Sequence, residues 1–477
     1  MVGNKIKNGV IWSVIGQFGY LGVSLLANII IARLLSPAEF GQLGIVLFFI
    51  SIARVLTDSG LGGALIRNNK ASDIDYSTIF IFNLIVSVLL CLVIILFSGQ
   101  ISIFYDDPVL KDLLIVASFI LIINAFQFVQ GAKLVKNMRF KEKAMYEFIA
   151  IVISTSIGIF LVLNDYGIWS LIVMQLTTAL VITILFWVFE GGHGSLKFSK
   201  ESFYFHYRFG ANTTIASILN SIFNNIYIAL LGKYFSVTET GLYFQAKKLQ
   251  EIPVGVINKL TQGVLFSGLS KIQDDKIQFK KMYQMVIRLF TVLVGLISLI
   301  LFIFSEEIIF ILIGKQWVEA SFFLKVLAVI GFFHIQEKFN RVLFKVFNDT
   351  KYILYLELIK KSIQIVSIVI GLSLQRLDVL MYGFIVTSVI SYFINFYFTY
   401  KKYNFLGLNE LVSVFKVLIV LVITTFVVSN ISITDLYWIN LILKIMLTFI
   451  LFIIGTISVG LLNVKGDMKF LKKKNDK

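Results

Sequence analysis

Ionisable residues occur inside long apolar stretches of this sequence, where their charge needs a partner or a wet cavity. Arg54 and Asp58 lie in the apolar run 41–66, four residues apart and therefore on one face of a helix. A charged group at the centre of a membrane helix costs roughly 2.5–3.5 kcal/mol on insertion scales. The pair could neutralise itself and pack two helices, or it could line a cavity that binds a charged ligand. Glu337 and Arg341 have the same spacing and are expected to form an ion pair.

Polar and helix-breaking residues recur at similar depth in other apolar runs. Asn28 lies in the run 9–32, and Asn224 lies in the run 209–231. Amides inside a membrane bond neighbouring helices, and they could equally bond the hydroxyl groups of a sugar. Pro253 removes a helix hydrogen bond and predicts a kink, which is either a fixed bend or a hinge.

The residue types that usually carry catalysis or hold metals are absent or scattered. The sequence has no G-x-x-x-x-G-K-[ST] phosphate loop, and its three histidines, His193, His206 and His334, lack metal-ligand spacing. The single cysteine, Cys91, lies in an apolar run, so neither a disulfide framework nor a thiolate metal site is available. We therefore expect no catalytic residues, no metal and no cofactor.

The apolar runs that surround these residues are long enough to cross a bilayer. Hydrophobic residues make up 58% of the 477 residues and the mean hydropathy is +0.89, whereas soluble domains average about 45–50% apolar residues. Since about 20 apolar residues span a bilayer as a helix, the sequence predicts an all-α polytopic membrane protein with about fourteen transmembrane helices. The predicted spans are 9–32, 41–66, 78–97, 112–132, 144–163, 167–189, 209–231, 241–268, 282–304, 318–346, 352–374, 378–400, 411–430 and 437–462.

The excess of basic residues follows the predicted topology. The formal net charge is +16 and the isoelectric point is about 9.6. With the N-terminus placed inside, most Lys and Arg residues fall in the loops and tails on that side, as the positive-inside rule requires. The opposite loops hold only five basic residues, which are Arg33, Lys111, Lys233, Lys315 and Arg376. We therefore predict a multi-pass protein of the inner (cytoplasmic) membrane, with both termini cytoplasmic and no nucleic-acid partner.

The chain contains an internal repeat. Glu39 and Gly41 at the start of the second span correspond to Glu239 and Gly241 at the start of the eighth, an offset of 200 residues. Spans 1–6 and 7–12 are therefore expected to be two copies of one six-helix unit in the same orientation, an arrangement that recurs in transporters. The predicted domains are an N-terminal six-helix lobe at 1–190, a C-terminal six-helix lobe at 191–403, and two additional helices with a basic tail at 404–477.

Two segments of the sequence resemble a known family. They are Asp58–Asn68 (DSGLGGALIRN) at the end of the second span, and Gly241–Ser270 (GLYFQAKKLQEIP, then GVLFSGLS from Gly263) across the eighth. Both are similar to the Wzx-type flippases, in the colanic-acid and teichuronic-acid exporter branch of the multidrug/oligosaccharidyl-lipid/polysaccharide exporter superfamily. Ser267 departs from the family pattern, in which proline is common at that position.

The resemblance implies a flippase that moves an undecaprenyl-pyrophosphate-linked oligosaccharide repeat unit across the cytoplasmic membrane by alternating access, for surface polysaccharide biosynthesis. Lipid-linked oligosaccharide and membrane lipids are the expected partners, with a polysaccharide polymerase and a chain-length regulator as further ones. The residues expected to bind the substrate are Arg54, Lys247, Lys248, Lys259, Asn28 and Asn224. The carboxylates expected to couple transport to an ion gradient are Asp58, Glu251 and Glu337, and Pro253 is the expected hinge.

Two other functions fit parts of the sequence. A cation-coupled multidrug exporter of the same superfamily would need an acidic or aromatic pocket, whereas basic residues outnumber acidic ones inside the predicted spans. An enzyme such as a repeat-unit polymerase or ligase would need a long outer loop with catalytic residues, and the longest predicted outer loop, 98–111, is short. The flippase interpretation is therefore preferred, with the multidrug exporter as the alternative.

Overall fold

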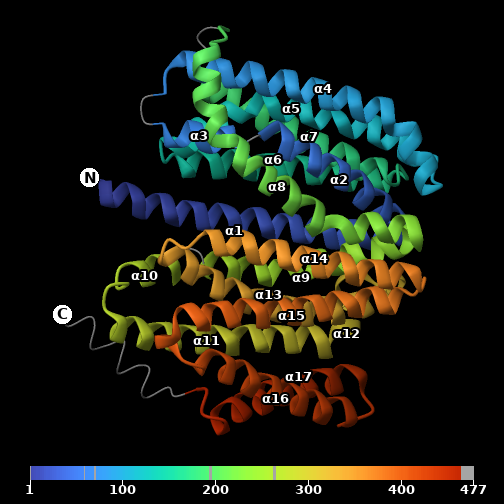
Figure 1. Cartoon of the computed structure of the whole chain (residues 1–477). Coiled ribbons are helices and arrows are strands. Elements are labelled where there is room, and N and C mark those ends of the chain that lie inside the picture. The colour runs from blue at the N-terminus through green and yellow to red at the C-terminus, as the bar shows by residue number, and fades with distance from the viewer. Residues whose placement is uncertain (1, 59, 69–70, 193–195, 262–264, 463–477) are drawn as a thin grey trace. The chain divides into compact units, whose positions relative to one another are not determined.

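The computed structural model describes residues 2–58, 60–68, 71–192, 196–261 and 265–462, with the backbone alone for 2–11, 13–15, 17, 208–213, 215–216, 258–260 and 267. Within these residues the chain forms helices and no strand (Figure 1). Ten helices of the described part are long and apolar enough to cross a membrane. The prediction of an all-α polytopic membrane protein is therefore confirmed.

The helices follow one another with short connections. In the first half of the chain they are α1 (Val2–Leu34), α2 (Pro37–Asp58), α3 (Leu61–Arg67), α4 (Asp73–Tyr105), α5 (Val109–Lys136), α6 (Phe140–Leu163), α7 (Trp169–Glu190), α8 (Lys200–Tyr234) and α9 (Val237–Leu260). In the second half they are α10 (Phe266–Ser270), α11 (Lys276–Ile303), α12 (Ser305–Ile313), α13 (Ala320–Val346), α14 (Lys351–Ser373), α15 (Leu377–Lys402), α16 (Asn409–Asn430) and α17 (Tyr437–Ser458). Two short 3₁₀ helices, η2 (Lys315–Trp317) and η3 (Asn404–Leu406), lie in the connections.

Long helices occupy all the predicted spans. The ten apolar helices account for most of them. Four predicted spans coincide with helices that are not among those ten. They are 9–32 (α1), 209–231 (α8), 241–268 (α9) and 352–374 (α14). The number of membrane crossings therefore stays a prediction.

The second predicted span is divided into two helices. α2 ends at Asp58, and α3 begins at Leu61 after Gly60, whose φ of 65° is in the left-handed region that favours glycine. Asp58 accepts a hydrogen bond from the backbone N–H of Gly62 and so binds the first turn of α3. The predicted span 41–66 follows the apolar residues on either side and misses this break, although Asp58 and Gly60 are of types that favour turns.

The internal repeat is visible in how equivalent helices begin. At the start of α2, the Glu39 carboxylate accepts hydrogen bonds from the Ser36 backbone N–H and hydroxyl, both at 2.8 Å, and the Glu39 N–H donates to the Ser36 hydroxyl at 3.4 Å. This reciprocal pair is a capping box. At the start of α9, the Glu239 N–H donates to the Ser236 hydroxyl at 3.0 Å. The predicted correspondence between Glu39 and Glu239 therefore extends to their local hydrogen bonding.

The repeated glycines bring the starts of α2 and α9 into direct backbone contact. A Cβ atom on Gly41 would lie 1.8 Å from the Val237 carbonyl oxygen, and one on Gly241 would lie 1.8 Å from the Pro37 carbonyl oxygen. The Cβ atom on Gly241 would also lie 2.9 Å from the Gly41 nitrogen. No side chain fits at such distances, so both positions require glycine for the close approach of two backbones.

The chain divides into two compact units. Unit 1 comprises Met1–Phe244 and Leu312–Gln316, and unit 2 comprises Gln245–Ile311 and Trp317–Lys477. In unit 1, α8 packs against α2, α3 and α4, although the repeat places it at the start of the second lobe. The domain boundaries expected near 190 and 403 stay predictions.

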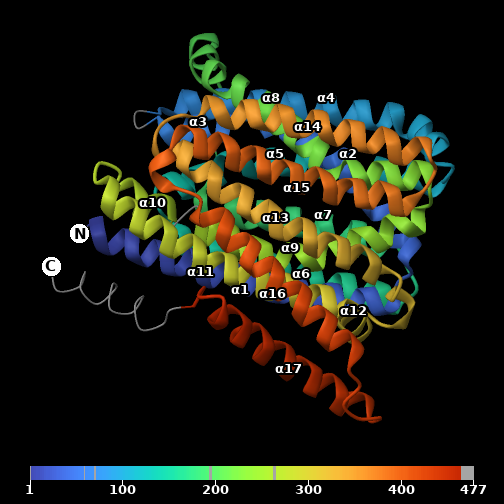
Figure 2. The same cartoon turned by 60° about the horizontal axis from the view of Figure 1, so that its bottom comes forward.

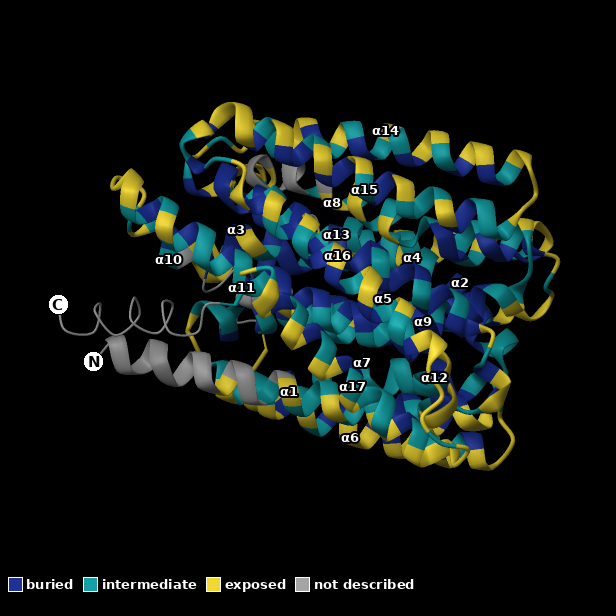
Figure 3. Cartoon of the chain, turned by 90° about the horizontal axis from the view of Figure 1, so that it is seen from below, coloured by how far each residue is buried: buried dark blue, intermediate teal, exposed yellow. Residues whose placement is uncertain are grey.

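The helices of unit 2 surround α13, which is the most buried of the apolar spans. In its most apolar stretch 78% of the residues are buried, and it packs against α11 and α15. α16 and α17 lie side by side in both views (Figures 1 and 2). Along α14, exposed residues recur over the whole length of the helix (Figure 3), and they include Leu358, Val366 and Val369. Such exposed apolar surface on a helix is expected of a membrane protein, because the lipid covers it.

Candidate functional site

Unit 1 contains a polar cavity of about 530 Å³ inside its helix bundle. Helices α1, α2, α5, α6 and α7 line it. The polar residues of its lining are Tyr20, Arg54, Asn124, Gln127, Lys143, Glu147, Gln175 and Thr178. The volume is in the range of ligand sites, which span about 300–1,000 Å³.

Arg54 is the residue that α2 contributes to this cavity. The neighbouring turn of α2 is fixed because the Asn83 side-chain amide donates to the Thr57 carbonyl at 2.7 Å, which ties α2 to α4. Among the described residues Arg54 forms no ion pair within 4.0 Å, and Asp58 binds α3 instead. The self-neutralising pair of Arg54 and Asp58, one of the two interpretations of their spacing, is therefore not formed in this structure.

The remaining polar groups of the lining are mostly neutral or already paired. Lys143 and Glu147 form an ion pair one turn apart on α6. On α5 the Gln127 amide donates to the Asn124 side-chain oxygen. On α7 the Thr178 hydroxyl donates to the Ser154 hydroxyl at 2.7 Å. The lining thus combines one cation without a carboxylate partner in the described part with several amides and hydroxyls.

This combination can hold an anionic group and neutral hydroxyl groups in one place. A guanidinium presents five N–H donors in a fixed fork that matches phosphate geometry. Inside a membrane its charge is costly unless an anion or water accompanies it. Amides and hydroxyls supply both donors and acceptors, as sugar hydroxyls require.

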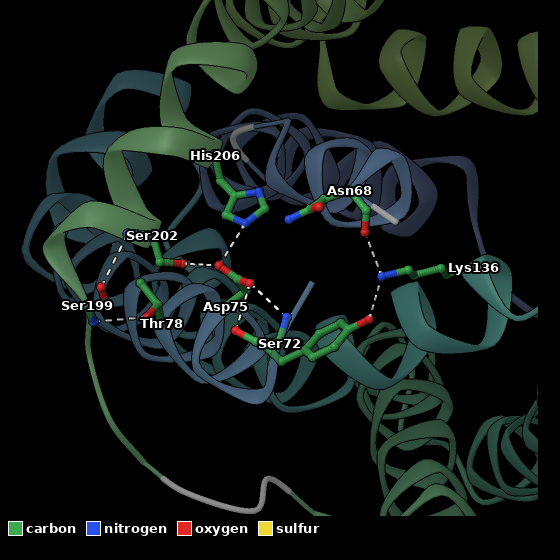
Figure 4. Close-up of polar contacts among 9 residues, drawn as sticks. Asn68, Ser72, Asp75, Thr78, Lys136, Ser199, Ser202 and His206 are labelled. Carbon is green, nitrogen blue, oxygen red and sulfur yellow. Dashed lines mark hydrogen bonds and ion pairs between the residues drawn. The ribbon is translucent and has the colours of Figure 1, made fainter. Parts of the chain in front are cut away.

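A polar cluster holds the start of α8 against the start of α4 (Figure 4). The Asp75 carboxylate accepts a hydrogen bond from the Ser202 hydroxyl at 2.5 Å and lies 3.2 Å from His206 Nε2. The backbone N–H of Ser199 donates to the Thr78 hydroxyl at 3.0 Å. The start of α8 is therefore anchored within unit 1 by side chains from the first turns of α4.

The other residues expected to bind substrate in unit 1 lie apart from this cavity. Asn28 is buried on α1 and Asn224 is exposed on α8, and neither lines the cavity around Arg54. Their expected role in substrate binding stays a prediction.

The expected site residues of α9 belong to unit 2. Lys247 Nζ lies 3.8 Å from the Glu251 carboxylate, and Lys248 is partly buried next to them. The side chain of Lys259 lies outside the described residues. α9 continues through Pro253, so both its role as a hinge and a cavity shared by the two repeats stay predictions.

Glu337 lies in a buried ionic network between α13 and α14. Arg341 pairs with Glu337, as its spacing predicts. Lys360 Nζ lies 2.7 Å from the second Glu337 oxygen. Arg341 also pairs with Glu357 at 2.5 Å, and Lys361 lies 3.3 Å from Glu357. Two cations, Arg341 and Lys360, therefore neutralise the charge of Glu337. The expected role of Glu337 in ion coupling stays a prediction.

We expect Glu337→Gln to destabilise the protein strongly, because it leaves the charges of Arg341 and Lys360 buried with one carboxylate fewer. Breaking one partner of a buried pair costs about 3–5 kcal/mol. The matched control is Glu306→Gln, which removes the exposed Lys325–Glu306 pair at 2.8 Å and should cost at most about 1 kcal/mol. Thermal unfolding of the two detergent-purified variants measures the difference. Equal melting temperatures would contradict the expectation.

The cavity contains residues that sequence reasoning did not single out. They are Tyr20, Asn124, Gln127, Lys143, Gln175 and Thr178. The signal that could have found four of them is spacing, since Asn124 and Gln127, and likewise Gln175 and Thr178, stand three residues apart within apolar runs. Such pairs share one helix face.

The chain matches known proteins in sequence. Residues 30–322 match the family described as polysaccharide biosynthesis protein. The lipopolysaccharide biosynthesis protein WzxC of Escherichia coli (strain K12) is 27% identical over 340 residues, which cover 69% of this chain and 67% of that protein. The succinoglycan biosynthesis transport protein ExoT of Rhizobium meliloti (strain 1021) is 24% identical over 315 residues. That match covers 66% of this chain and 64% of ExoT, so it spans less than two thirds of the relative's length.

The fold is similar to that of solved membrane transporters. The lipid II flippase MurJ, in an inward closed conformation, has a TM-score of 0.74 at 15% identity, covering 94% of this chain and 98% of that one. An inward-facing multidrug resistance MATE family transporter of the MOP superfamily has a TM-score of 0.58 at 16% identity, covering 80% and 94%. These likenesses show the fold, which agrees with the superfamily that the sequence resembles. Because the family match at residues 30–322 covers more than half of the chain, the protein belongs to the polysaccharide biosynthesis protein family.

Proposed function

We propose that this protein is a flippase that moves undecaprenyl-pyrophosphate-linked oligosaccharide repeat units across the cytoplasmic membrane for surface polysaccharide biosynthesis. The family membership and the names of the relatives WzxC and ExoT support a role in polysaccharide biosynthesis. The fold shared with a lipid II flippase supports movement of a lipid-linked substrate. The protein would carry its substrate without changing it chemically.

The observation that carries this proposal is Arg54 in its polar cavity, with no ion pair to a carboxylate among the described residues. A pyrophosphate needs such a cation in a medium of low dielectric constant. The amides of Asn124, Gln127 and Gln175 suit the glycan. A multidrug exporter for organic cations would instead need unpaired carboxylates, whereas Glu147 of this lining is paired with Lys143.

A second cavity suits the lipid part of the substrate. It measures about 470 Å³ and lies in unit 2 between α11, α13 and α16. Its lining is apolar and includes Phe302, Phe332, Leu421 and Phe426. A polyprenyl chain needs no polar partner and can leave the bilayer for such a lining. We therefore assign the lipid chain a path along α11, α13 and α16.

The rest of the mechanism extends this proposal to both repeats. Lys247, Lys248 and Lys259 of α9 would bind the pyrophosphate when the substrate passes from one repeat to the other, with Pro253 as the hinge of α9. The substrate enters from the cytoplasmic side, where both termini lie. A polysaccharide polymerase and a chain-length regulator act on the product in the outer leaflet.

Reconstitution tests the proposal directly. Liposomes that contain the purified protein and extracted pyrophosphate-linked oligosaccharide should expose the glycan to a hydrolase added outside faster than protein-free liposomes do. Efflux of an organic cation dye from the same preparation is the parallel measurement. Dye efflux without any change in glycan exposure would contradict the flippase and support the multidrug exporter.

A further inference from the structure

We propose that Glu410 is a proton-binding site through which a proton gradient drives this transporter, which deepens the function proposed above and rests on it. Glu410 lies in the first turn of α16 and is only 6% exposed. The Tyr283 hydroxyl of α11 donates to one of its carboxylate oxygens at 2.8 Å. The Asn340 side-chain amide of α13 donates to the other at 2.7 Å. One carboxyl group therefore joins three helices of unit 2.

Glu410 has no cation partner among the described residues, in contrast to Glu337. Its two hydrogen bonds come from neutral groups, whereas Glu337 is held by Arg341 and Lys360. A buried carboxylate without a countercharge is costly, and the group avoids this cost by taking up a proton. Two bound cations give Glu337 no such reason to be protonated. Glu410 is thus the better suited of the two to exchange a proton.

The other titratable groups around Glu410 do not replace that countercharge. Tyr283 and Tyr392 face it from α11 and α15, and the hydroxyl of Tyr392 has no hydrogen-bond partner in the described part. On α16 itself, Lys416 is engaged with the Val459 carbonyl at 2.6 Å. On α13 the cation next to Asn340 is Arg341, which binds Glu337 and Glu357.

A small cavity beside Glu410 can hold a water molecule that exchanges a proton with it. The cavity has a volume of about 10 Å³, which is room for about one water molecule. Tyr400, Tyr403 and Gly407 are among the other residues that line it. Lys280 Nζ of α11 lies near Gly407, 3.9 Å from where a Cβ of that glycine would be. The size fits a water that carries a proton, whereas a metal ion bound at this carboxylate would need further oxygen ligands. Asn340 moreover turns its N–H, not its oxygen, toward the carboxylate.

Polar side chains continue from Glu410 along α13. The Asn340 amide also donates to the Gln336 carbonyl at 3.2 Å, and the Thr291 hydroxyl donates to the Gln336 side-chain oxygen at 3.0 Å. Gln336 Nε2 and Asn340 Oδ1 are buried without a hydrogen-bond partner in the described part. Unpaired buried polar atoms of this kind are sites where water enters transiently. These atoms extend the polar path from Glu410 along α13 within unit 2.

Protonation of Glu410 would change how α11, α13 and α16 are held together. The ionised carboxylate accepts both hydrogen bonds, whereas the protonated group becomes a donor at one oxygen and cannot accept there in the same way. One of the contacts to Tyr283 or Asn340 must then rearrange. A proton thereby favours one arrangement of the three helices over another, which is what coupling to a gradient requires.

Two measurements on the full-length protein in liposomes test this proposal. Infrared spectroscopy follows the carbonyl band of a protonated carboxyl group during a pH titration, independently of any transport. We expect Glu410→Gln to remove a titrating band that the exposed control Glu319→Gln retains. Tyr283→Phe keeps the carboxyl but removes a donor to its ionised form, so the midpoint should move to higher pH. A titration unchanged by both Glu410→Gln and Tyr283→Phe would overturn the proposal.

The second measurement is glycan exposure with and without a proton gradient, in sodium-containing and sodium-free buffers. Glu410→Gln should lose the stimulation by the gradient, and Glu410→Asp should retain part of it. Stimulation that persists in Glu410→Gln, or that needs sodium, would overturn the assignment of a proton to Glu410. If the wild-type protein exposes no glycan under any condition, the proposed function fails, while the infrared titration still decides whether Glu410 binds a proton.

Discussion

Arg54→Ala is expected to reduce surface polysaccharide production strongly while the protein still inserts into the membrane, with lipid-linked repeat units accumulating in the cytoplasmic leaflet. Arg54 lines the polar cavity of unit 1, and its loss removes the cation that would bind pyrophosphate there. A hydrogen bond to a charged group contributes about 1.5–3 kcal/mol, so the transport rate should fall roughly 10- to 100-fold. The measurement is polymer yield in a strain that lacks its own transporter.

Two further variants sharpen the interpretation of this result. Arg54→Lys should recover part of the rate, because an ammonium keeps the charge but loses the bidentate geometry. Arg376→Ala is the control, since Arg376 is an exposed residue at the start of α15 that pairs with Asp378. Lys248→Ala is expected to act like Arg54→Ala if both repeats handle the pyrophosphate. Normal polymer yield in the Arg54 and Lys248 variants together would remove the basis for an anionic substrate.

Gly241→Ala is expected to cause a large loss of folded protein although it adds a single methyl group. The added Cβ would lie 1.8 Å from the Pro37 carbonyl oxygen, and Gly41→Ala would create the same conflict with Val237. Backbone atoms cannot move aside as flexible side chains do, so the cost should reach or exceed the upper end of the 1–3 kcal/mol that overpacking typically costs. Thermal unfolding and yield after detergent extraction measure the effect.

Gly99→Ala is the matched control for this prediction. Gly99 lies inside α4, and apart from its chain neighbours and the adjacent backbone of its own helix no atom lies within 4 Å of the Cβ that it would gain. Alanine there should be neutral or slightly stabilising, because it lowers the entropy of the unfolded chain and raises helix propensity. A Gly241→Ala protein as stable as Gly99→Ala would mean that α2 and α9 do not approach each other as closely as described.

The helices could be predicted well from the sequence because a single physical signal defines them. The spans predicted at 144–163 and 411–430 correspond to α6 (Phe140–Leu163) and α16 (Asn409–Asn430). The signal fails where a helix leaves the apolar layer. α4 continues to Tyr105, beyond the predicted end at 97, because its final turns still form helix although Ser98, Gly99, Gln100 and Ser102 interrupt the apolar run. Hydropathy reports the membrane, whereas helix ends depend on caps such as Asp106, whose φ is 55°.

The candidate sites were predicted only in part, for reasons that differ between residues. Arg54 could be singled out because a cation in an apolar run is costly wherever it stands. For Asn124 and Gln175 the spacing to a second polar residue was the available signal, but an amide in a membrane helix more commonly bonds a neighbouring helix, and only the structure places both at one cavity. Glu410 was missed because the predicted span began at 411, which put the carboxylate in a loop where charge costs little. The structure buries it.

The contact between Gly41 and Gly241 has an evolutionary consequence. In a two-fold symmetric pair, a residue near the axis meets its own copy, so a contact between equivalent positions marks where such an axis would pass. Gly241 approaches the Gly41 nitrogen in this way. A six-helix ancestor that dimerised through this contact would have carried one glycine codon serving both subunits. Fusion of its duplicated gene would then have turned a single indispensable glycine into two, each of which can now be altered separately.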